Sequence, residues 1–142
     1  MGDPLWPRAS AWLADAASVE QPDVVVIGVP SSVASISTSD ARSAPAAFRL
    51  AMAGFSPFDS DRNLDLAALV VADHGDLALD DTSMEASQRD IAEAARSMET
   101  TGVRTYLGGD NAITRPLVGA IGPDLTSVGV VTLDAHHDVR SL

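Results

Sequence analysis

The sequence of 142 residues contains no cysteine, no lysine and few aromatic side chains, which make up 4% of the total. Without cysteine, disulfides and thiolate metal or redox sites are excluded. Without lysine, all nine basic residues are arginines, and with twenty acidic residues the formal net charge is −11. Nucleic acids and anionic membranes both require clustered positive charge, so we expect neither as a partner. The acidity is compatible with binding metal cations and also with solubility alone.

Long apolar runs are missing as well. No apolar stretch approaches the roughly 18 residues that a membrane-spanning helix needs, and the opening MGDPLWPRAS lacks the basic segment and apolar core of a secretory signal. We therefore expect a cytoplasmic protein. The length suits one domain, and the apolar content of 46%, mostly Ala, Val and Leu, favours a layered α/β or helical fold.

Runs of β-branched residues predict strands that are buried on both faces. Two such runs lie at residues 23–30 and 67–77, the second ending near Ala72, and two further strands are predicted at residues 103–110 and 126–134. Helices are predicted at residues 10–18, 44–53, 82–101 and 112–121. Ser43 is expected to cap the second helix, and a capping box formed by Thr82 and Glu85 is expected to open the third.

The alternation of strands and helices predicts right-handed crossovers and a mostly parallel sheet with helices on both faces, a three-layer α/β/α sandwich. With no internal repeat and no linker, residues 1–142 are expected to belong to one domain. A serine-rich stretch without periodicity, residues 31–43, follows the first strand. A loop of this length is either functional or a mobile surface segment.

The strongest candidate site follows the last predicted strand. In open α/β sheets ligands bind beyond the carboxyl ends of the strands. In extended backbone, alternate side chains point to the same side, so Asp134, His136 and Asp138 can converge on one point while His137 faces away. Two carboxylates and one imidazole suit Mn²⁺, Zn²⁺ or Fe²⁺. The alternative is that the two aspartates cap the next turn and His136 satisfies backbone groups.

Other polar clusters are weaker signals. The LGGDNA segment, with Asp110 and Asn111, is by itself typical of a tight strand-to-helix turn with an N-cap, and the acid-rich turn at Asp73, His74 and Asp76 favours a scaffolding role. No G-x-G-x-x-G or Walker motif follows the first strand, which argues against nucleotide binding. The G-x-S-x-G motif of serine hydrolases is also missing.

The segments GVPSS, DARSAPAAFR, DHGDL, YLGGDNAIT and VVTLDAHHDVRSL occur in the order found in ureohydrolases. The sequence therefore resembles the ureohydrolase family, which includes arginases, agmatinases and formimidoylglutamases, along nearly its whole length. The Asp-Ala-His-x-Asp element is fairly specific to this family. The HHDVRSL ending is most similar to bacterial formimidoylglutamases.

The resemblance implies an arginase-like α/β/α sandwich with two manganese ions at the strand ends, of which residues 1–142 are the N-terminal portion. It implies that Asp134 bridges the ions, with His136 on one ion and Asp138 on the other. Asn111 stands where the family usually has a histidine ligand, so its amide oxygen is a weaker candidate ligand and the centre could be mononuclear. The family's later Asp-x-Asp pair does not occur in this sequence, and catalytic and substrate-binding residues are not assigned.

The function that the resemblance implies is manganese-dependent hydrolysis of a C–N bond in a linear amidine. The nearest form is conversion of N-formimidoyl-L-glutamate and water to L-glutamate and formamide, a step of histidine metabolism. The alternatives are agmatinase or another guanidino hydrolase, and a degenerate homologue that binds a ligand without catalysis. We expect a small-molecule substrate, a homo-oligomer for the full-length enzyme, and an isolated 142-residue chain that is inactive and poorly stable.

Overall fold

Four strands form a parallel sheet in the order β1-β5-β2-β6. The computed structural model describes residues 6–122 and 124–135. The strands are β1 (Ala14–Asp15), β2 (Val24–Val29), β5 (Val71–Asp76) and β6 (Val103–Gly108). The central strand β2 is buried at five of its six residues because β5 and β6 pair with its two edges and helices cover its faces. Three of the predicted strands are thus confirmed, although β5 continues past Ala72 to Asp76.

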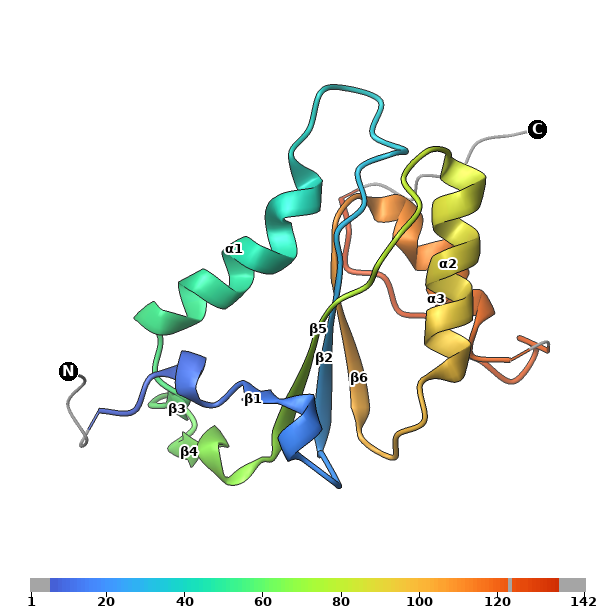
Figure 1. Cartoon of the computed structure of the whole chain (residues 1–142). Coiled ribbons are helices and arrows are strands. Elements are labelled where there is room, and N and C mark those ends of the chain that lie inside the picture. The colour runs from blue at the N-terminus through green and yellow to red at the C-terminus, as the bar shows by residue number, and fades with distance from the viewer. Residues whose placement is uncertain (1–5, 123, 136–142) are drawn as a thin grey trace.

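Helices lie on both faces of this sheet. Helix α1 (Ala44–Ala51) is on one side, and α2 (Met84–Ser97) and α3 (Thr114–Gly119) are on the other (Figure 1). The chain passes from β2 through α1 to β5, and from β5 through α2 to β6, so helical segments separate the parallel strands as the sequence predicted. The expected three-layer α/β/α arrangement is confirmed.

The apolar core fills the space between the sheet and helices α2 and α3. Val29, Ile91 and Ile113 form a buried cluster, which is extended by four partly buried side chains, Leu77, Leu79, Tyr106 and Leu117. Ile91 lies on the buried face of α2, with Ala92 and Ala95, and it is 1% exposed. Burial of a side chain of this size contributes about 1.5–3 kcal/mol, so this cluster is a main source of stability.

The start of α1 differs in one detail from the sequence prediction. Pro45 lies in the first turn, where a missing N–H costs nothing. Ser43 occupies the N-cap position, but its hydroxyl makes no cap hydrogen bond and instead donates to the carbonyl of Asp40 at 2.8 Å. The predicted side-chain cap is therefore wrong, because a 3₁₀ turn, η3 (Ala41–Ser43), runs directly into the helix.

The start of α2 is shifted by one residue from its predicted cap. Ser83, not Thr82, is the N-cap, and its hydroxyl accepts from the N–H of Ala86 at 3.1 Å. The Thr82 N–H donates to the carboxylate of Asp80 at 3.0 Å, which holds Thr82 in the preceding turn. The capping-box prediction identified the helix start but assigned the wrong capping residue.

Strand β5 contains one extra residue relative to β2. Val26 pairs with Asp73 and Gly28 pairs with Asp76, so two steps on β2 oppose three on β5. Gly75 lies within this bulge at φ 71°, a left-handed conformation that favours glycine. The bulge brings Asp73 and Asp76 to the same face of the sheet, and a Cβ at Gly28 would overlap the Asp76 carboxylate.

The predicted entry helix at residues 10–18 is wrong. The segment consists of a 3₁₀ turn, η1 (Ala9–Ala11), the short strand β1 and a second 3₁₀ turn, η2 (Ala16–Ser18). β1 pairs with β5, and the Asp15 carboxylate caps η2 by accepting from the Ala17 N–H at 2.9 Å. Pairing with the sheet edge and a local Asp cap override the modest helix propensity of this alanine-rich stretch.

The predicted strand at residues 126–134 is also wrong, since the structure describes this segment without a strand. Val131 is 88% exposed and Leu133 is 98% exposed. A strand that is apolar on both faces needs a partner strand and cover on each face. Among the described residues, β6 pairs only with β2, and the segment 126–134 pairs with no strand and is exposed apart from the half-buried Val128.

A small antiparallel hairpin connects α1 to the sheet and was not predicted. It is formed by β3 (Phe58–Asp59) and β4 (Leu64–Asp65), between the 3₁₀ turns η4 (Met52–Gly54) and η5 (Leu66–Ala68). The chain turns at Asn63, which adopts a φ of 51°. None of the helices described here is long and apolar enough to cross a bilayer.

Candidate metal-binding site at the strand ends

The carboxyl ends of β2, β5 and β6 lie at one edge of the sheet, and the loops that follow them come together there (Figure 1). The loop after β2 extends beyond this edge before the chain enters α1, as the blue-to-cyan segment of Figure 1 shows. This loop contains the serine-rich stretch that was predicted to lack regular structure, and up to Asp40 it has neither helix nor strand. Polar groups from three loops are therefore available at a single edge.

The turns after β2 and β6 are held against each other by their backbones. The N–H of Gly109 donates to the carbonyl of Val29 at 3.0 Å, and the N–H of Asp110 donates to the carbonyl of Ser31 at 2.9 Å. A Cβ on Gly109 would overlap the Ser31 backbone, so only glycine permits this approach. The Ser31 hydroxyl is buried and lies 3.2 Å from the Ser87 hydroxyl of α2, which joins the same turn to the second helix.

Asp110 connects two segments through its two carboxylate oxygens. Its Oδ1 accepts from the N–H of Ala112 at 3.1 Å and so caps the 3₁₀ turn η6 (Asn111–Ile113). Its Oδ2 accepts from the N–H of Ala34 at 3.0 Å and from the hydroxyl of Ser35 at 3.3 Å. The expectation that the GGDN segment forms a capped turn is confirmed, and the same carboxylate also holds the loop after β2.

A cluster of one arginine and two aspartates lies where β5 meets α1. Arg49 donates to Asp73 through Nε at 2.6 Å and Nη2 at 2.8 Å, and to Asp76 through Nη1 at 2.5 Å. These hydrogen bonds from Arg49 hold the pKa of the Asp73 carboxyl below its usual range, and the N–H of Gly75 adds a further bond. The pKa of Arg49 is raised in turn, chiefly by its bond to Asp73. The scaffolding role predicted for Asp73 and Asp76 agrees with this pairing.

A second ion pair joins the segments that precede the two long helices. Arg42, in the turn before α1, pairs with Oδ2 of Asp81, in the turn before α2. Because α1 and α2 lie on opposite faces of the sheet (Figure 1), this pair spans the carboxyl edge. The Arg42 side chain is 53% exposed, so the pair contributes little to stability and mainly restrains the loop.

The structure describes two of the four predicted metal ligands. Asn111 is the first residue of η6, is exposed, and its side-chain oxygen accepts from the hydroxyl of Thr114 at 3.2 Å. Asp134 is exposed and lies in the irregular segment after α3. His136 and Asp138 lie outside the described residues, as does His137. The convergence of Asp134, His136 and Asp138 thus stays a prediction.

Within residues 6–122 and 124–135, no three His, Asp or Glu side chains are grouped so that they could hold a metal ion. This agrees with the scaffolding role of Asp73 and Asp76, whose oxygens are engaged by Arg49. Asn111 is separated from the Asp-rich part of β5 by its place after β6, on the far side of β2.

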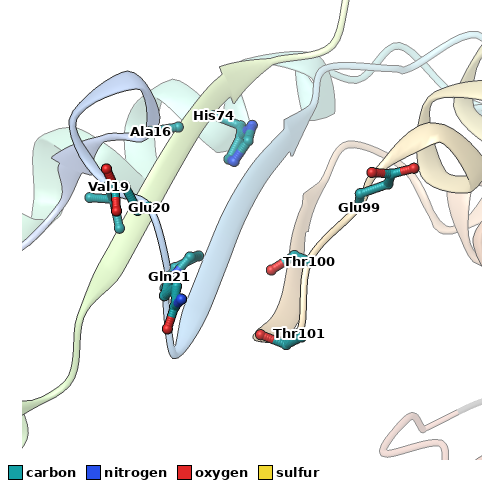
Figure 2. Close-up of a pocket in the computed structure, with 9 residues that line it drawn as sticks. Ala16, Val19, Glu20, Gln21, His74, Glu99, Thr100 and Thr101 are labelled. Carbon is teal, nitrogen blue, oxygen red and sulfur yellow. The ribbon is translucent and has the colours of Figure 1, made fainter.

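A cavity of about 620 Å³ lies away from this edge, between the loops that precede β2 and β6 (Figure 2). His74 of β5 and the side chains of Glu20, Gln21 and Glu99 line it. These loops enter the amino ends of their strands, opposite the edge at which α/β sheets bind ligands. The cavity is therefore not part of the predicted site.

Sequence reasoning missed the two contacts that hold the serine-rich loop, and also the pairing of Arg49 with two aspartates of β5. The signal for the first was Asp110, which was interpreted only as an N-cap although a carboxylate has a second oxygen to share. The signal for Arg49 was the spacing of Asp73 and Asp76 around Gly75, because two acids three residues apart in a strand share a face only across a bulge. Nothing in the local sequence marks the pairing of Arg42 with Asp81, which are 39 positions apart.

Comparison with known proteins agrees with this architecture. A family model described as the arginase family matches residues 22–142. Formimidoylglutamase of Halalkalibacterium halodurans is 37% identical over 120 residues, which cover 82% of this chain and 38% of that protein. Formimidoylglutamase of Halobacterium salinarum is 37% identical over 125 residues, covering 84% of this chain and 39% of the relative. The chain thus spans about two fifths of the length of these relatives.

The fold is similar to a solved structure of the same kind. The crystal structure of formimidoylglutamase from Bacillus subtilis superposes with a TM-score of 0.83 at 28% identity, covering 99% of this chain and 45% of that one. A mitochondrial agmatinase of Gallus gallus is 32% identical over 135 residues, covering 88% of this chain and 37% of its own length. The matched residues include the β2, β5 and β6 strand ends described above. The chain belongs to the arginase family.

Proposed function

We propose that residues 1–142 are the N-terminal portion of a single arginase-like α/β domain, and that the whole protein is a formimidoylglutamase. The reaction is hydrolysis of N-formimidoyl-L-glutamate: water adds to the amidine carbon, the bond from this carbon to the glutamate nitrogen breaks, and L-glutamate and formamide leave. The observation that carries this proposal is the 37% identity to two formimidoylglutamases over most of the chain. Histidine metabolism and the cytoplasm are the corresponding pathway and location.

Manganese is the metal that we propose for the site. Formiminoglutamase of Trypanosoma cruzi, 24% identical with a TM-score of 0.75, has been solved with manganese. The donor set proposed here, the carboxylates of Asp134 and Asp138 with the imidazole of His136, is of the type that suits this ion. Asn111 offers a neutral amide oxygen as a weaker fourth ligand. When bound, manganese would activate water and polarise the amidine.

The described residues support this site rather than perform the chemistry. Arg49 neutralises Asp73 and Asp76, which leaves these carboxylates unable to compete for the metal. Asp110 orients η6 and with it Asn111, the first residue of that turn. The backbone bonds from Gly109 and Asp110 bring the loop after β2 to the same edge. We propose a small-molecule substrate and a homo-oligomeric whole protein, neither of which changes these local roles.

The second candidate is a guanidino hydrolase such as agmatinase. Its support is the identity of 32% to the Gallus gallus agmatinase, which is lower than the identity to the formimidoylglutamases. The serine-rich loop after β2, whose only acidic side chain is Asp40, also offers little to a substrate with a cationic tail. A non-catalytic relative is the third candidate, supported by Asn111 in place of the expected histidine.

The test measures the products released by the 142-residue chain and by the complete product of the gene that encodes it, each with Mn²⁺. N-formimidoyl-L-glutamate and agmatine are the two substrates. We expect formamide from the complete product and none above background from the 142-residue chain. Urea from agmatine instead of formamide would establish the guanidino alternative, and tight Mn²⁺ binding without either product would establish the non-catalytic one. Turnover by the 142-residue chain alone would refute the proposal that it is only a portion of the active domain.

A further inference from the structure

The loop after β2, residues 31–40, is fastened at both ends although it has no regular structure. At its start, Asp110 accepts two hydrogen bonds from it, and the carbonyl of Ser31 accepts the N–H of Asp110. Just beyond its end, Arg42 pairs with Asp81 in the turn before α2. Fastened loops keep their shape on ligand binding, and a preformed loop spares a ligand the entropy of ordering it.

The two carboxylate oxygens of Asp110 accept hydrogen bonds from different segments, so capping of η6 and attachment of the loop each depend on one oxygen. Oδ1 serves the turn that begins with Asn111, and Oδ2 serves Ala34 and Ser35 of the loop. Hydrogen bonds to a charged carboxylate are stronger than those between neutral groups. One residue therefore fixes the loop relative to the β6 turn that carries a candidate metal ligand.

The exposed part of the loop is rich in hydroxyl groups and contains no basic residue. Ser37 and Thr38 are exposed, and Asp40 is the loop's only charged side chain. At the neighbouring strand ends, the carboxylates of Asp73 and Asp110 already accept hydrogen bonds from the protein. Hydroxyl donors thus remain available here, and they suit a ligand that presents carboxylate oxygens better than one that presents an ammonium group.

We propose that Asp110 is a positioning residue, which holds the loop 31–40 over the strand ends so that its hydroxyl groups bind the carboxylate end of the substrate. The inference rests on the proposed function and names the part of the chain that recognises the glutamate portion of the amidine. Asp110 itself touches neither the substrate nor the metal.

The fastening is tested by amide hydrogen exchange on the 142-residue chain. Asp110→Asn keeps an oxygen for the Ala112 N–H but turns an amide NH₂ toward the Ala34 N–H, so the loop bonds are lost and the cap survives. We expect exchange of the Ala34 and Ser35 amides to rise at least tenfold, with the amides of β2 and β6 unchanged. Asp65→Asn is the matched control, because Asp65 caps η5 through the Ala67 N–H in the same way and is outside the loop.

Recognition is tested by calorimetric titration of the complete gene product, loaded with Mn²⁺, with N-formimidoyl-L-glutamate and with agmatine. We expect the carboxylate-bearing ligand to bind, and its affinity to fall at least tenfold in Asp110→Asn but not in Asp65→Asn. Asp110→Glu, which keeps both oxygens, should recover part of the affinity. A residue that acted only on stability would change unfolding without this difference between ligands.

Equal affinity of Asp110→Asn and the unaltered protein for N-formimidoyl-L-glutamate, or unchanged exchange at Ala34, would each overturn the inference. The proposed function fails separately, when the ligand binds and no formamide is released.

Discussion

At the scale of single residues, Arg49 organises the end of β5. Its guanidinium engages Asp73 with two nitrogens and Asp76 with the third, a geometry that a point charge such as lysine does not reproduce. Asp73 and Asp76 come to one face only through the bulge at Gly75. The contact of α1 with the end of β5 through Arg49 therefore depends on this bulge. Sequence patterns marked Asp73 and Asp76 but not Arg49, whose contact with them depends on how α1 packs on the sheet.

The cluster of Arg49, Asp73 and Asp76 predicts how the unfolding free energy depends on pH. The pKa of Asp73 in the folded chain is lowered by Arg49, whereas in the unfolded chain it returns to about 3.9. The resulting stabilisation is present above that value and is lost as the pH falls through the folded-state pKa. We expect the unfolding free energy of Asp73→Asn to fall less steeply than that of the unaltered chain between about pH 4 and pH 2.

Urea unfolding followed by circular dichroism at several pH values measures this slope. Glu93→Gln removes the same charge from an exposed position of α2 and serves as control. If the unfolding free energies of Asp73→Asn and of the unaltered chain fall in parallel with pH, Arg49 does not lower the pKa of Asp73 in the folded chain.

Asn111 makes a prediction about metal affinity. Imidazole is a stronger ligand for manganese than an amide oxygen, so Asn111→His is expected to tighten Mn²⁺ binding by about tenfold or more if this position belongs to the centre. Calorimetry on the complete gene product measures the change. Gln21→His places the same imidazole at the amino end of the sheet, where it should have no effect, and a similar gain from both variants would remove Asn111 from the site.

At the scale of elements, the N-cap of α2 differs between the sequence prediction, which was Thr82, and the structure, in which it is Ser83. Thr82 and Ser83 are both good caps by type, and the choice depends on Asp80, which binds the Thr82 N–H and delays the helix by one residue. We expect Ser83→Ala to lower the unfolding free energy by about 1 kcal/mol. Thr82→Ala should cost clearly less, and the reverse order in urea unfolding would place the cap at Thr82 after all.

How far an element could be predicted depended on where its partners lie. The strands around Val25 and Val71 were predictable because apolar residues there are buried, whereas β6 was predicted although its residues are only exposed or half-buried, and it is held by pairing with β2 along its length. The segment 126–134 is also apolar, but an apolar pattern does not show whether a neighbouring strand is present. The described residues contain no strand that pairs with this segment. The predicted helix at residues 10–18 was wrong for the opposite reason, because β1 pairs with β5 and nothing in its own sequence indicates this partner.

Sequence patterns located a candidate site at the strand ends but did not show what holds its loops. The strand-end rule directed attention to the residues after β2, β5 and β6, whose loops the structure brings to one edge. It did not reveal that Asp110 serves two loops, since that depends on the close approach of Gly109 to Ser31. Distances between loops from different strands are set by the register of the sheet, which a linear pattern does not contain.

At the scale of the whole molecule, the outer edge of β6 predicts self-association. Val103 at its start is 67% exposed, and within the described residues no strand pairs with this edge. Unpaired strand edges with apolar side chains promote pairing between molecules. We expect the 142-residue chain to self-associate with increasing concentration in sedimentation velocity experiments.

Val103→Lys should reduce this association, because a charge on an edge strand opposes pairing. Ile36→Lys is the matched control: it removes an apolar side chain that is 92% exposed in the loop after β2, away from the edge. A chain that stays monomeric at all concentrations, or an equal effect of the two variants, would mean that the β6 edge is not what drives association.

The bulge in β5 has a consequence for which changes of length the protein can tolerate. Deleting one residue at His74 or Gly75 would remove the bulge and leave Asp73 and Asp76 two positions apart, the spacing at which side chains of a regular strand share a face. Asp76 would therefore still face Arg49, and Leu77, which contacts the core cluster, would stay on its side of the strand. A deletion elsewhere in β5 would instead shift the strand by one residue and exchange its inside and outside.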